Sequence, residues 1–445
     1  MKLREVVIGA NASIFYRFDF SKIRGVYYPR TEAEAKEAIA EARLKGLVVT
    51  VKGGGSGLSG ACTGGNDERI VLSTLRMRRI LGVNESEGYV DVEPGVTPDE
   101  INEFLAPYGL RFYVAPSSRD VATVGGILNT DGGGNDTWVN GTMRDNTIRA
   151  RMVLYDGRTI EVTRNGVRSE DAALEQELNR LHMTIDDIAS SHGTLGFVTE
   201  LRLHVRPVSE EEVIGGVAHF DDAAELGQAI GRLVDAKSPI RYGEAIVMAH
   251  PDIRGDLRPP LLIMQFPEDD LEAIRELVDV RVLTDSEVEK MKDIRIKLPK
   301  RNPVEGVQLA LFEGYGLHDT SLERMQEVVA QIDDILVRHG YVPFAKYGHA
   351  PSKWYVGNNE PTYGMVMHSR EIRPPEQSPK EVLATILEIV DACEELGVTP
   401  KPEHKWPYSD MAKKTRLSQL REVLGQGFNN FIFCDDCAEA LAKMV

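Results

Sequence analysis

The sequence predicts an α+β protein whose first half is glycine-rich and whose second half forms an antiparallel sheet with helices on one face. Two observations lead to this fold class. A β-branched run, residues 48–51, ends in residues 53–65, of which seven of thirteen are glycine, so the backbone there can adopt positive φ and lie flat against a ligand. Beyond residue 207, short strand-like runs alternate with amphipathic segments of helix length, which is typical of a sheet covered on one face.

Composition limits the class of partner. The chain has 445 residues, of which 42% are hydrophobic, and this is enough for two or three domains. Its net charge of −17 argues against nucleic acid, because binding by counterion release needs clustered Lys and Arg. The N-terminus lacks a signal-peptide core and no run approaches the ~18 apolar residues of a membrane span. We therefore expect a cytoplasmic protein that binds a small molecule or another protein.

The four cysteines are too few for a disulfide scaffold. Cys434 and Cys437 form a C-x-x-C pair, but a zinc or iron–sulfur site would need further cysteines near it. We interpret the pair as structural or redox-labile, with a subunit contact as the alternative.

A βαβ unit is predicted to deliver the glycine-rich loop. Thr31 and Glu34 form a capping box that opens a helix, and Gly46 ends it. Strands are expected on either side, at residues 25–28 and 47–51. The next predicted elements are strands at 70–73 and 89–93 and a helix at 97–106 that begins at Thr97 and Pro98.

The loop itself allows two interpretations. Residues 55–60 satisfy G-x-G-x-x-G, but a Rossmann site also needs a helix at the third glycine. Residues 61–67 are turn-like and residues 69–73 read as a strand. We therefore interpret the loop as a nest of backbone N–H groups that holds a pyrophosphate without a helix behind it.

Two further segments share this character. Residues 116–134 and 191–200 are rich in glycine and small hydroxyl side chains, which again suits close approach of a backbone to a ligand. Three separated segments of this kind imply one long ligand with several parts.

The order and spacing of these motifs resemble the flavin domain of the vanillyl-alcohol oxidase / p-cresol methylhydroxylase superfamily. Within it, the chain is most similar to the glycolate oxidase flavoprotein subunit and D-lactate dehydrogenase group. The resemblance runs from about Tyr28 to Pro207 and rests on Lys52–Gly57, Pro116–Gly126, Gly141–Asn146, Tyr155–Arg158 and Gly193–Glu200.

This resemblance implies a two-subdomain FAD-binding domain of the p-cresol methylhydroxylase type and a cap domain over the flavin ring. The corresponding boundaries are residues 1–207 for the FAD-binding domain, 208–390 for the substrate or cap domain, and 391–445 for a segment that returns to the FAD-binding domain.

The resemblance also implies which residues bind FAD. The first loop should bind the pyrophosphate, the second segment should line the ribityl chain and flavin, and the third should close over the cofactor, with Val198 near the adenine end. The expected residues are Gly53, Gly54, Gly55, Ser56, Gly57, Leu58, Pro116, Ser117, Ala122, Thr123, Gly126, Asn129, His192, Gly193, Gly196 and Val198. Because Ser56 stands where relatives with a covalent flavin often have histidine, we expect non-covalent FAD.

Past Pro207 the pattern predicts the elements of the cap. Strands are expected at 213–220, 240–249, 261–266, 307–312, 343–347 and 365–368, and helices at 221–236, 268–278, 285–297, 321–339 and 377–396.

Oxidation of a 2-hydroxy acid needs a cation for the carboxylate and a base for the hydroxyl, while FAD takes the hydride at N5. Arginine suits the first role and histidine the second. By position, Arg295 resembles the family's carboxylate-binding residue, and a solvated helix face is its alternative interpretation. Tyr347-Gly348-His349 resembles the start of the family's His-x-Gly-Asp-Gly-Asn-x-His motif, and Pro402–Lys405 resembles its Ser-Gly-Glu-His-Gly motif. The expected catalytic residues are His349, His404, Arg295 and Glu403.

Both motifs depart from the family pattern, since Val356 replaces the second histidine and Lys405 the last glycine. In relatives these histidines and the glutamate can hold a divalent metal, and such ligands suit zinc or manganese. If the family site is kept, its ligands here would be His349, His368 and Glu403. In the simpler hypothesis His349 and His404 bind substrate or transfer a proton.

Three functions are considered. The favoured one is an FAD-dependent dehydrogenase or oxidase of a small 2-hydroxy acid, of the D-lactate or glycolate type, which passes electrons to a quinone or an electron-transfer protein. The second is another flavoenzyme on this fold, of the alkylglycerone-phosphate synthase or sugar-lactone oxidase type, for which a basic phosphate pocket of Arg370, Arg373, Lys300 or Arg301 would argue. The third is a non-catalytic flavin subunit. A homodimer, a complex with an iron–sulfur subunit and a peripheral membrane location are the expected modes of assembly.

Overall fold

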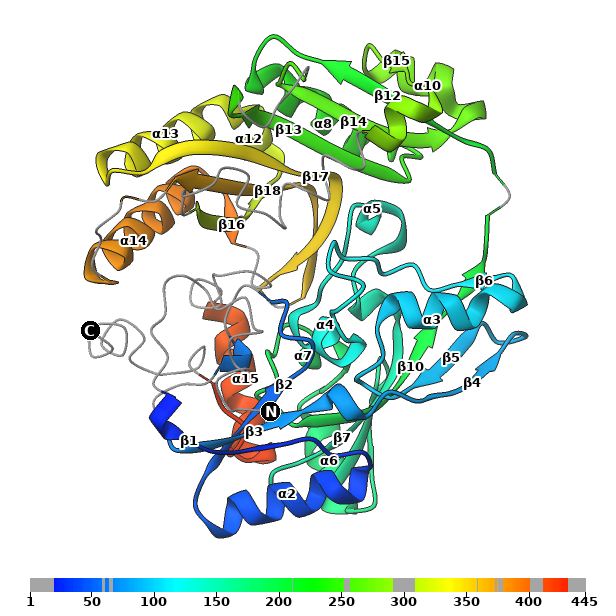
Figure 1. The fold of residues 1–445 in the computed structure, drawn as a ribbon, viewed down its shortest axis with the longest axis vertical. Helices are drawn as coiled ribbons and strands as arrows, with labels where there is room; N and C mark the ends of the chain where they lie inside the picture. Colours follow the sequence, from blue (N-terminus) through cyan, green and yellow to red (C-terminus); the bar gives the residue numbers. More distant parts are fainter. Residues whose placement is uncertain are drawn as a thin grey trace.

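The computed structural model describes residues 20–57, 61–63, 67–209, 211–251, 257–290, 309–357, 359–372, 374, 379–400 and 411–430. It has a lower part that contains β1–β11 and an upper part in which helices lie over a large sheet (Figure 1). The mixed helical and antiparallel architecture confirms the predicted α+β fold class.

The first sheet is the predicted βαβ unit. Strands β1 (Ile23–Tyr27), β2 (Val48–Lys52) and β3 (Arg69–Ser73) are parallel, in the order β1-β3-β2. Helix α2 (Glu32–Leu44) begins at Thr31, whose hydroxyl accepts from the N–H of Glu34. The Glu34 carboxylate accepts from the N–H of Arg30, one residue before the position that a capping box requires, so only half of the predicted box forms.

A six-stranded antiparallel sheet follows, in the order β4-β5-β10-β7-β8-β9. Its helices pack over it and bury a continuous apolar core that includes Ile101, Leu128 and Leu201. The bounds are β4 (Ile80–Asn84), β5 (Tyr89–Val92), β7 (Thr147–Val153), β8 (Thr159–Thr163), β9 (Gly166–Ser169), β10 (Phe197–His204), α3 (Pro98–Leu105), α4 (Val124–Thr130), α5 (Thr137–Asn140), α6 (Ala172–Arg180) and α7 (Ile185–Ile188). A two-stranded ribbon of β6 (Leu110–Arg111) and β11 (Arg206–Pro207) completes this part.

The cap is an eight-stranded sheet in the order β15-β12-β14-β13-β17-β18-β16-β19. One face packs on helices, because Ala245 and Met367 share a core with Leu226 and Ile332. The strands are β12 (Val213–His219), β13 (Tyr242–Ala249), β14 (Leu261–Pro267), β15 (Arg281–Val282), β16 (Leu309–Leu317), β17 (Val342–Val356), β18 (Glu360–Ile372) and β19 (Thr399–Pro400), and the helices are α8 (Ala223–Asp235), α10 (Leu271–Leu277), α12 (Asp319–Glu323), α13 (Met325–Arg338) and α14 (Pro379–Glu395).

Two predictions for the cap were wrong in their bounds. Strands β17 and β18 are much longer than residues 343–347 and 365–368, since their far ends pair with each other as a hairpin. The helix predicted over 321–339 is divided at Arg324 into α12 and α13. Residues 291–297 of the helix predicted over 285–297 lie outside the described residues.

The described end of the chain packs against the glycine-rich half. Helix α15 (Met411–Leu424) places Leu417, Leu420 and Leu424 in the core of the six-stranded sheet. The N–H of Val49 donates to the carbonyl of Gly427 at 2.8 Å, beside an isolated parallel bridge between Val49 and Phe428. The boundaries at residues 207 and 390 stay predictions.

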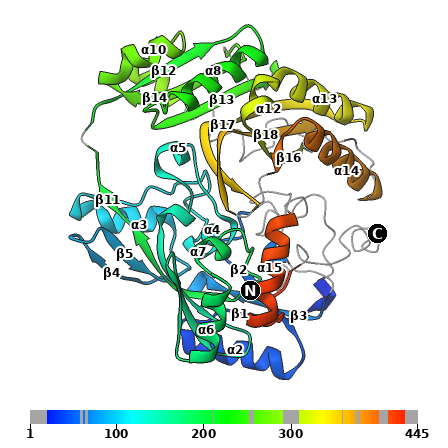
Figure 2. The same ribbon diagram turned by 180° about the vertical axis from the view of Figure 1, so that it is seen from behind.

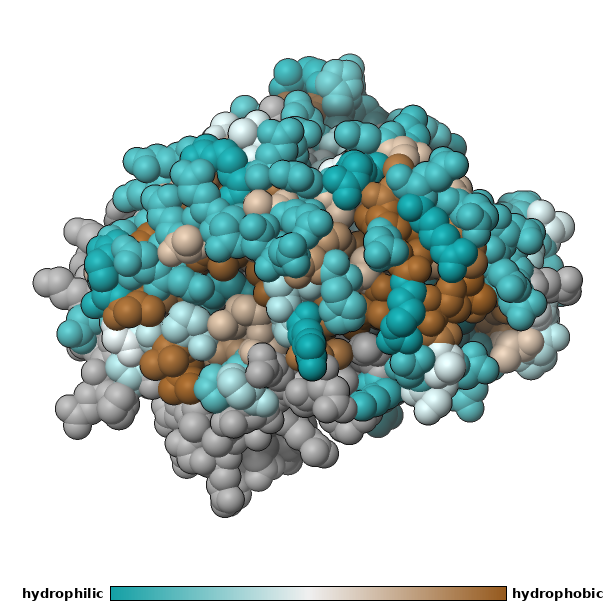
Figure 3. Space-filling model, turned by 90° about the horizontal axis from the view of Figure 1, so that it is seen from above, coloured by the Kyte–Doolittle hydropathy of each residue, from teal (hydrophilic) through white to brown (hydrophobic). Residues whose placement is uncertain are grey.

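Seen from behind, α8, α12 and α13 again lie on the side of the cap sheet away from α4 and α15 (Figure 2). From above, this outer side is mostly hydrophilic, with hydrophobic residues gathered in patches (Figure 3). Among the described helices, none is both long and apolar enough to cross a bilayer.

Candidate functional site

The first and second glycine-rich segments touch backbone to backbone. A Cβ added at Gly54 would lie 1.9 Å from the carbonyl oxygen of Val121, and one at Gly53 would lie 2.5 Å from Oγ1 of Thr123. Beside them, the hydroxyls of Ser56 and Ser118 are 3.4 Å apart. No side chain fits at these two glycines, so the loop after β2 is held directly against the segment that opens α4.

The second and third segments are joined through Asn129. Its Oδ1 accepts from the Ser191 hydroxyl at 3.0 Å and its carbonyl accepts from the N–H of His192 at 2.8 Å. The same side chain donates through Nδ2 to the carbonyl of Gly125 at 2.8 Å. One buried amide thus fixes both segments.

The third segment returns to the first. His192 and Gly193 have φ of 54° and 78°, in the left-handed region, and a Cβ on Gly193 would lie 3.1 Å from Cβ of Val51 in β2. The His192 carbonyl accepts from Nδ2 of Asn430 at 2.9 Å, so the chain after α15 also contacts this segment. The three glycine-rich segments therefore form one closed cluster, although they are far apart in sequence.

This cluster fits a diphosphate-linked cofactor. Within the described part of the chain, the N–H groups of Gly54, Gly55 and Gly57 donate no hydrogen bond, and bare amides on a loop suit a phosphate. The buried Oγ1 of Thr123 likewise has no hydrogen-bond partner among the described residues, and a buried hydroxyl without a partner is costly unless a bound group supplies one.

The other predicted FAD residues are placed as follows. Gly196 allows tight packing on β7, because a Cβ there would lie 2.9 Å from Cε of Met152. Val198 is buried in the core of the six-stranded sheet. Ala122 and Gly126 flank Thr123 in the cluster, whereas Pro116 is half-buried and Ser117 is exposed. Leu58 lies outside the described residues.

A second group of polar side chains lies on the cap. Glu244 on β13 is directly opposite His349 on β17, and Tyr347 on β17 is directly opposite His368 on β18. The two imidazole rings meet edge to face with centroids 5.2 Å apart, and the Tyr347 ring lies 5.6 Å from that of His368. Because Ala245 and Met367 point to the helix-covered core, strand alternation places this group on the opposite face.

That face meets the glycine-rich half at Asn135, which follows the second segment. Its Nδ2 donates to the carbonyl of Gly243 at 3.0 Å and to the carboxylate of Glu244. Oε2 of Glu244 lies 3.6 Å from Nδ1 of His349, with side chains 2% and 15% exposed. The cap histidines are therefore adjacent to the segment that is predicted to line the flavin.

A polar clamp holds the β17–β18 hairpin to the same half. Asp145 accepts from Nζ of Lys353 at 2.9 Å and from the hydroxyl of Tyr355 at 2.6 Å. The Arg144 guanidinium stacks 4.1 Å above the Tyr355 ring and donates to Asn359. Burial acts to raise the pKa of Asp145, but the hydrogen bonds from Tyr355 and Lys353 outweigh it and hold the pKa below its usual value.

Several predicted residues lie outside the described part of the chain: Arg295, Lys300, Arg301, Arg373, Glu403, His404, Cys434 and Cys437. His349, His368 and Arg370 are described, and Arg370 is buried two residues after His368 on β18. Among the described residues, no three His, Cys, Asp or Glu side chains form a group that could hold a metal ion. We derive no step through a metal.

Sequence reasoning missed Glu244 and Asn135. Glu244 is the only charged residue in the otherwise apolar β13, and such a residue signals either a buried partner or a site. Asn135 ends the run Gly132–Gly134. Their contact joins residues 109 positions apart, which no local pattern contains.

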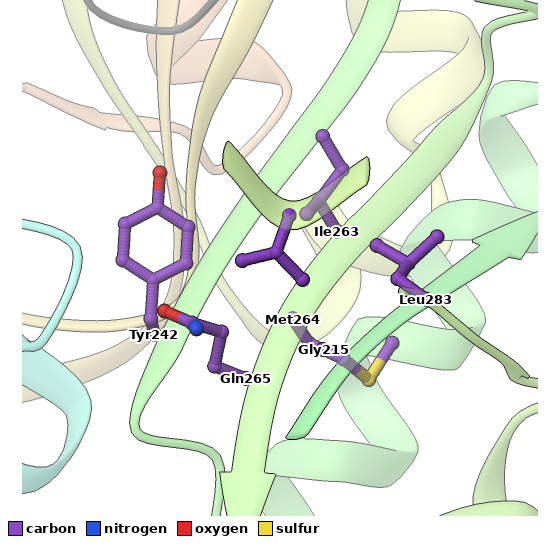
Figure 4. A pocket seen from close by; sticks show the side chains of 7 residues that line it. Gly215, Tyr242, Ile263, Met264, Gln265 and Leu283 are labelled. Atoms are coloured by element: carbon purple, nitrogen blue, oxygen red, sulfur yellow. The ribbon is translucent and has the colours of Figure 1, made fainter. Parts of the chain in front are cut away.

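A small cavity elsewhere in the cap does not suit a substrate. It is lined by Gly215, Tyr242, Ile263, Met264, Gln265, Leu283 and Val288, and its volume is about 10 Å³, which is barely room for one water molecule. Figure 4 shows Tyr242 and Gln265 side by side on one side of it and Leu283 on the other.

The comparisons with known proteins agree with this geometry. Residues 23–163 match the family model described as an FAD binding domain. The chain therefore contains an FAD-binding domain, and FAD is its indicated cofactor. The match covers β1 to β8 and so includes the first two glycine-rich segments of the cluster.

Two curated relatives align with part of the chain, including this FAD-binding domain. D-2-hydroxyglutarate dehydrogenase of Escherichia coli (strain K12) is 35% identical over 139 residues, which are 31% of this chain and 14% of that protein. The mitochondrial D-lactate dehydrogenase [cytochrome] of Arabidopsis thaliana is 30% identical over 210 residues, which are 46% of this chain and 34% of that protein. The chain thus spans about a third or less of the length of these relatives.

The likeness of the whole fold extends further. A solved structure of alkyldihydroxyacetonephosphate synthase superposes with a TM-score of 0.65 at 14% identity and covers 91% of this chain and 76% of its own. At that identity the likeness concerns the fold alone, and it includes the cap as well as the FAD-binding domain.

Proposed function

We propose that the protein is an FAD-dependent dehydrogenase of a small 2-hydroxy acid. The observation that carries this proposal is the meeting of His349 and His368, with Glu244 beside them, on the cap face that contacts Asn135 of the FAD-binding domain. The names of the relatives, D-2-hydroxyglutarate and D-lactate dehydrogenases, support the same substrate class.

The chemistry follows from what each group supplies. FAD, when bound, accepts the hydride that leaves the substrate Cα with its electron pair. The hydroxyl proton must go to a base as the C=O bond forms, and imidazole suits this step near neutral pH. We assign the proton to Nε2 of His349, so the 2-hydroxy acid becomes a 2-oxo acid with hydride and proton both accounted for.

The substrate carboxylate needs a cation. Arg295, His404 and Glu403 stay proposed catalytic residues outside the described part of the chain. D-lactate, glycolate and D-2-hydroxyglutarate are the proposed substrates. A quinone or an electron-transfer protein, including an iron–sulfur subunit, is the proposed acceptor.

Anaerobic mixing of the FAD-loaded protein with each of these acids tests the proposal. We expect at least one D-acid or glycolate to bleach the flavin absorbance near 450 nm, and the L-enantiomers serve as controls. If FAD is bound but no acid reduces it, while dithionite does, the proposed function is wrong and a non-catalytic flavin subunit is favoured.

The same experiment separates the other flavoenzyme types. An alkylglycerone-phosphate synthase type would leave the flavin oxidised with every hydroxy acid, and a sugar-lactone oxidase type would be reduced by the lactone or its sugar alone. Of the basic residues that would favour a phosphate pocket, Arg370 is the one within the described residues.

A further inference from the structure

We propose that Glu244 is the positioning residue for His349 and that Asn135 holds Glu244 in place from the FAD-binding domain. This inference rests on the proposed function, because it assigns how the proposed base is oriented. It adds a third member, from a different domain, to the two residues that the cap itself supplies.

The first step is the burial of the carboxylate. Glu244 is 1% exposed in an apolar strand, where a carboxylate is costly unless it accepts hydrogen bonds. Asn135 donates to it and also donates to the carbonyl of Gly243. The N–H of Gly243 in turn donates to the carbonyl of Asn135 at 3.3 Å, so the loop is fixed to β13 by backbone and side chain together.

The second step is the direction of the carboxylate. Antiparallel register places Glu244 directly across from His349, and Oε2 faces Nδ1 at 3.6 Å. This distance is longer than a hydrogen bond, but hydrogen bonds of a catalytic site are often long before substrate binds and shorten in the complex. A carboxylate at Nδ1 favours the tautomer with the proton on Nδ1, which leaves Nε2 to accept the hydroxyl proton.

The third step concerns the cofactor. Asn135 directly follows Gly132–Gly134, and this run begins two residues after α4 ends at Thr130. The loop that fixes Glu244 therefore continues the segment that contacts the first glycine loop. Base and cofactor would be placed by one stretch of chain.

The test is a kinetic comparison of Glu244→Gln with the wild type. The amide keeps the volume and accepts from Asn135, but it removes the negative charge at Nδ1. Anaerobic stopped-flow with the acid that reduces the wild-type flavin should show a limiting reduction rate about 10²-fold lower, with unchanged substrate Kd and unchanged FAD content. Glu360→Gln, the same change at an exposed position of β18, is the matched control and should behave as wild type.

A double-mutant cycle distinguishes positioning from a merely structural role. If Glu244 acts through His349, Glu244→Gln combined with His349→Ala should be no slower than His349→Ala alone, because effects on one functional unit are not additive. Asn135→Ala, which leaves Glu244 in place, should lower the reduction rate about 10-fold with the same unchanged Kd, and it serves if Glu244→Gln does not fold.

The outcomes are separable. If the wild type is reduced and Glu244→Gln is equally fast, the inference is overturned while the proposed function stands. The inference is also overturned if the two losses multiply in the double variant, or if substrate Kd or FAD content changes in place of the rate. If no hydroxy acid reduces the wild type, the proposed function itself fails.

Discussion

At the scale of single residues, the FAD cluster depends on the absence of side chains at Gly53 and Gly54. We predict that Gly54→Ala weakens FAD binding at least about tenfold, because a Cβ there would lie 1.9 Å from the carbonyl of Val121 and must push the two loops apart. Tenfold corresponds to ~1.4 kcal/mol. Fluorescence titration of the apoprotein with FAD measures this effect. Gly82→Ala in β4, where nothing lies within 4 Å of the added atom, is the control, and equal affinities for the two variants would contradict the prediction.

Residues also mark how far sequence reasoning reached. The glycine-rich loops and His349 were recognisable because their residue types and order are local patterns. His368 was named only as a candidate ligand, and its contact with His349 comes from strand register. Glu244 and Asn135 were missed, since the partner of a buried carboxylate is decided by tertiary structure.

At the scale of elements, the β17–β18 hairpin is what reaches from the cap to the FAD-binding domain. Its near halves were predicted as strands from their apolar residues. Its far half carries Lys353 and Tyr355, which are partly buried only because Asp145 and Arg144 meet them, and strand propensity depends on such surroundings. The sequence therefore predicted the hairpin's existence and underestimated its length.

We predict that Asp145→Asn destabilises the protein by about 1–3 kcal/mol near neutral pH, the cost of weakening hydrogen bonds at a buried charged group. The pKa of Asp145 is lowered in the folded state, so its contribution is present above the unfolded pKa and is lost as pH falls through the folded pKa. The stability difference between wild type and variant, measured by urea unfolding, should therefore shrink in acid. Asp269→Asn, at an exposed position before α10, should change little. A difference independent of pH would contradict this account of the clamp.

At the scale of the whole molecule, FAD joins parts of the chain that its own contacts bring together only in the folded state. We predict that the cofactor is released on denaturation, since Ser56 occupies the place where a covalent flavin would need histidine. After acid precipitation the yellow colour should be in the supernatant, and a pellet that stays yellow after washing would show a covalent bond. Before denaturation, free FAD at 100 times its Kd should add ~2.7 kcal/mol of stability.

The central claim is that the flavin held by the three glycine-rich segments lies against the cap face of Glu244, His349 and His368. A crystal structure of the FAD complex with a bound 2-hydroxy acid measures this directly. The account predicts the pyrophosphate on the amides of residues 53–57 and the substrate hydroxyl within hydrogen-bond distance of Nε2 of His349. A flavin ring that lies remote from this face, or a substrate hydroxyl held by other residues, would contradict it.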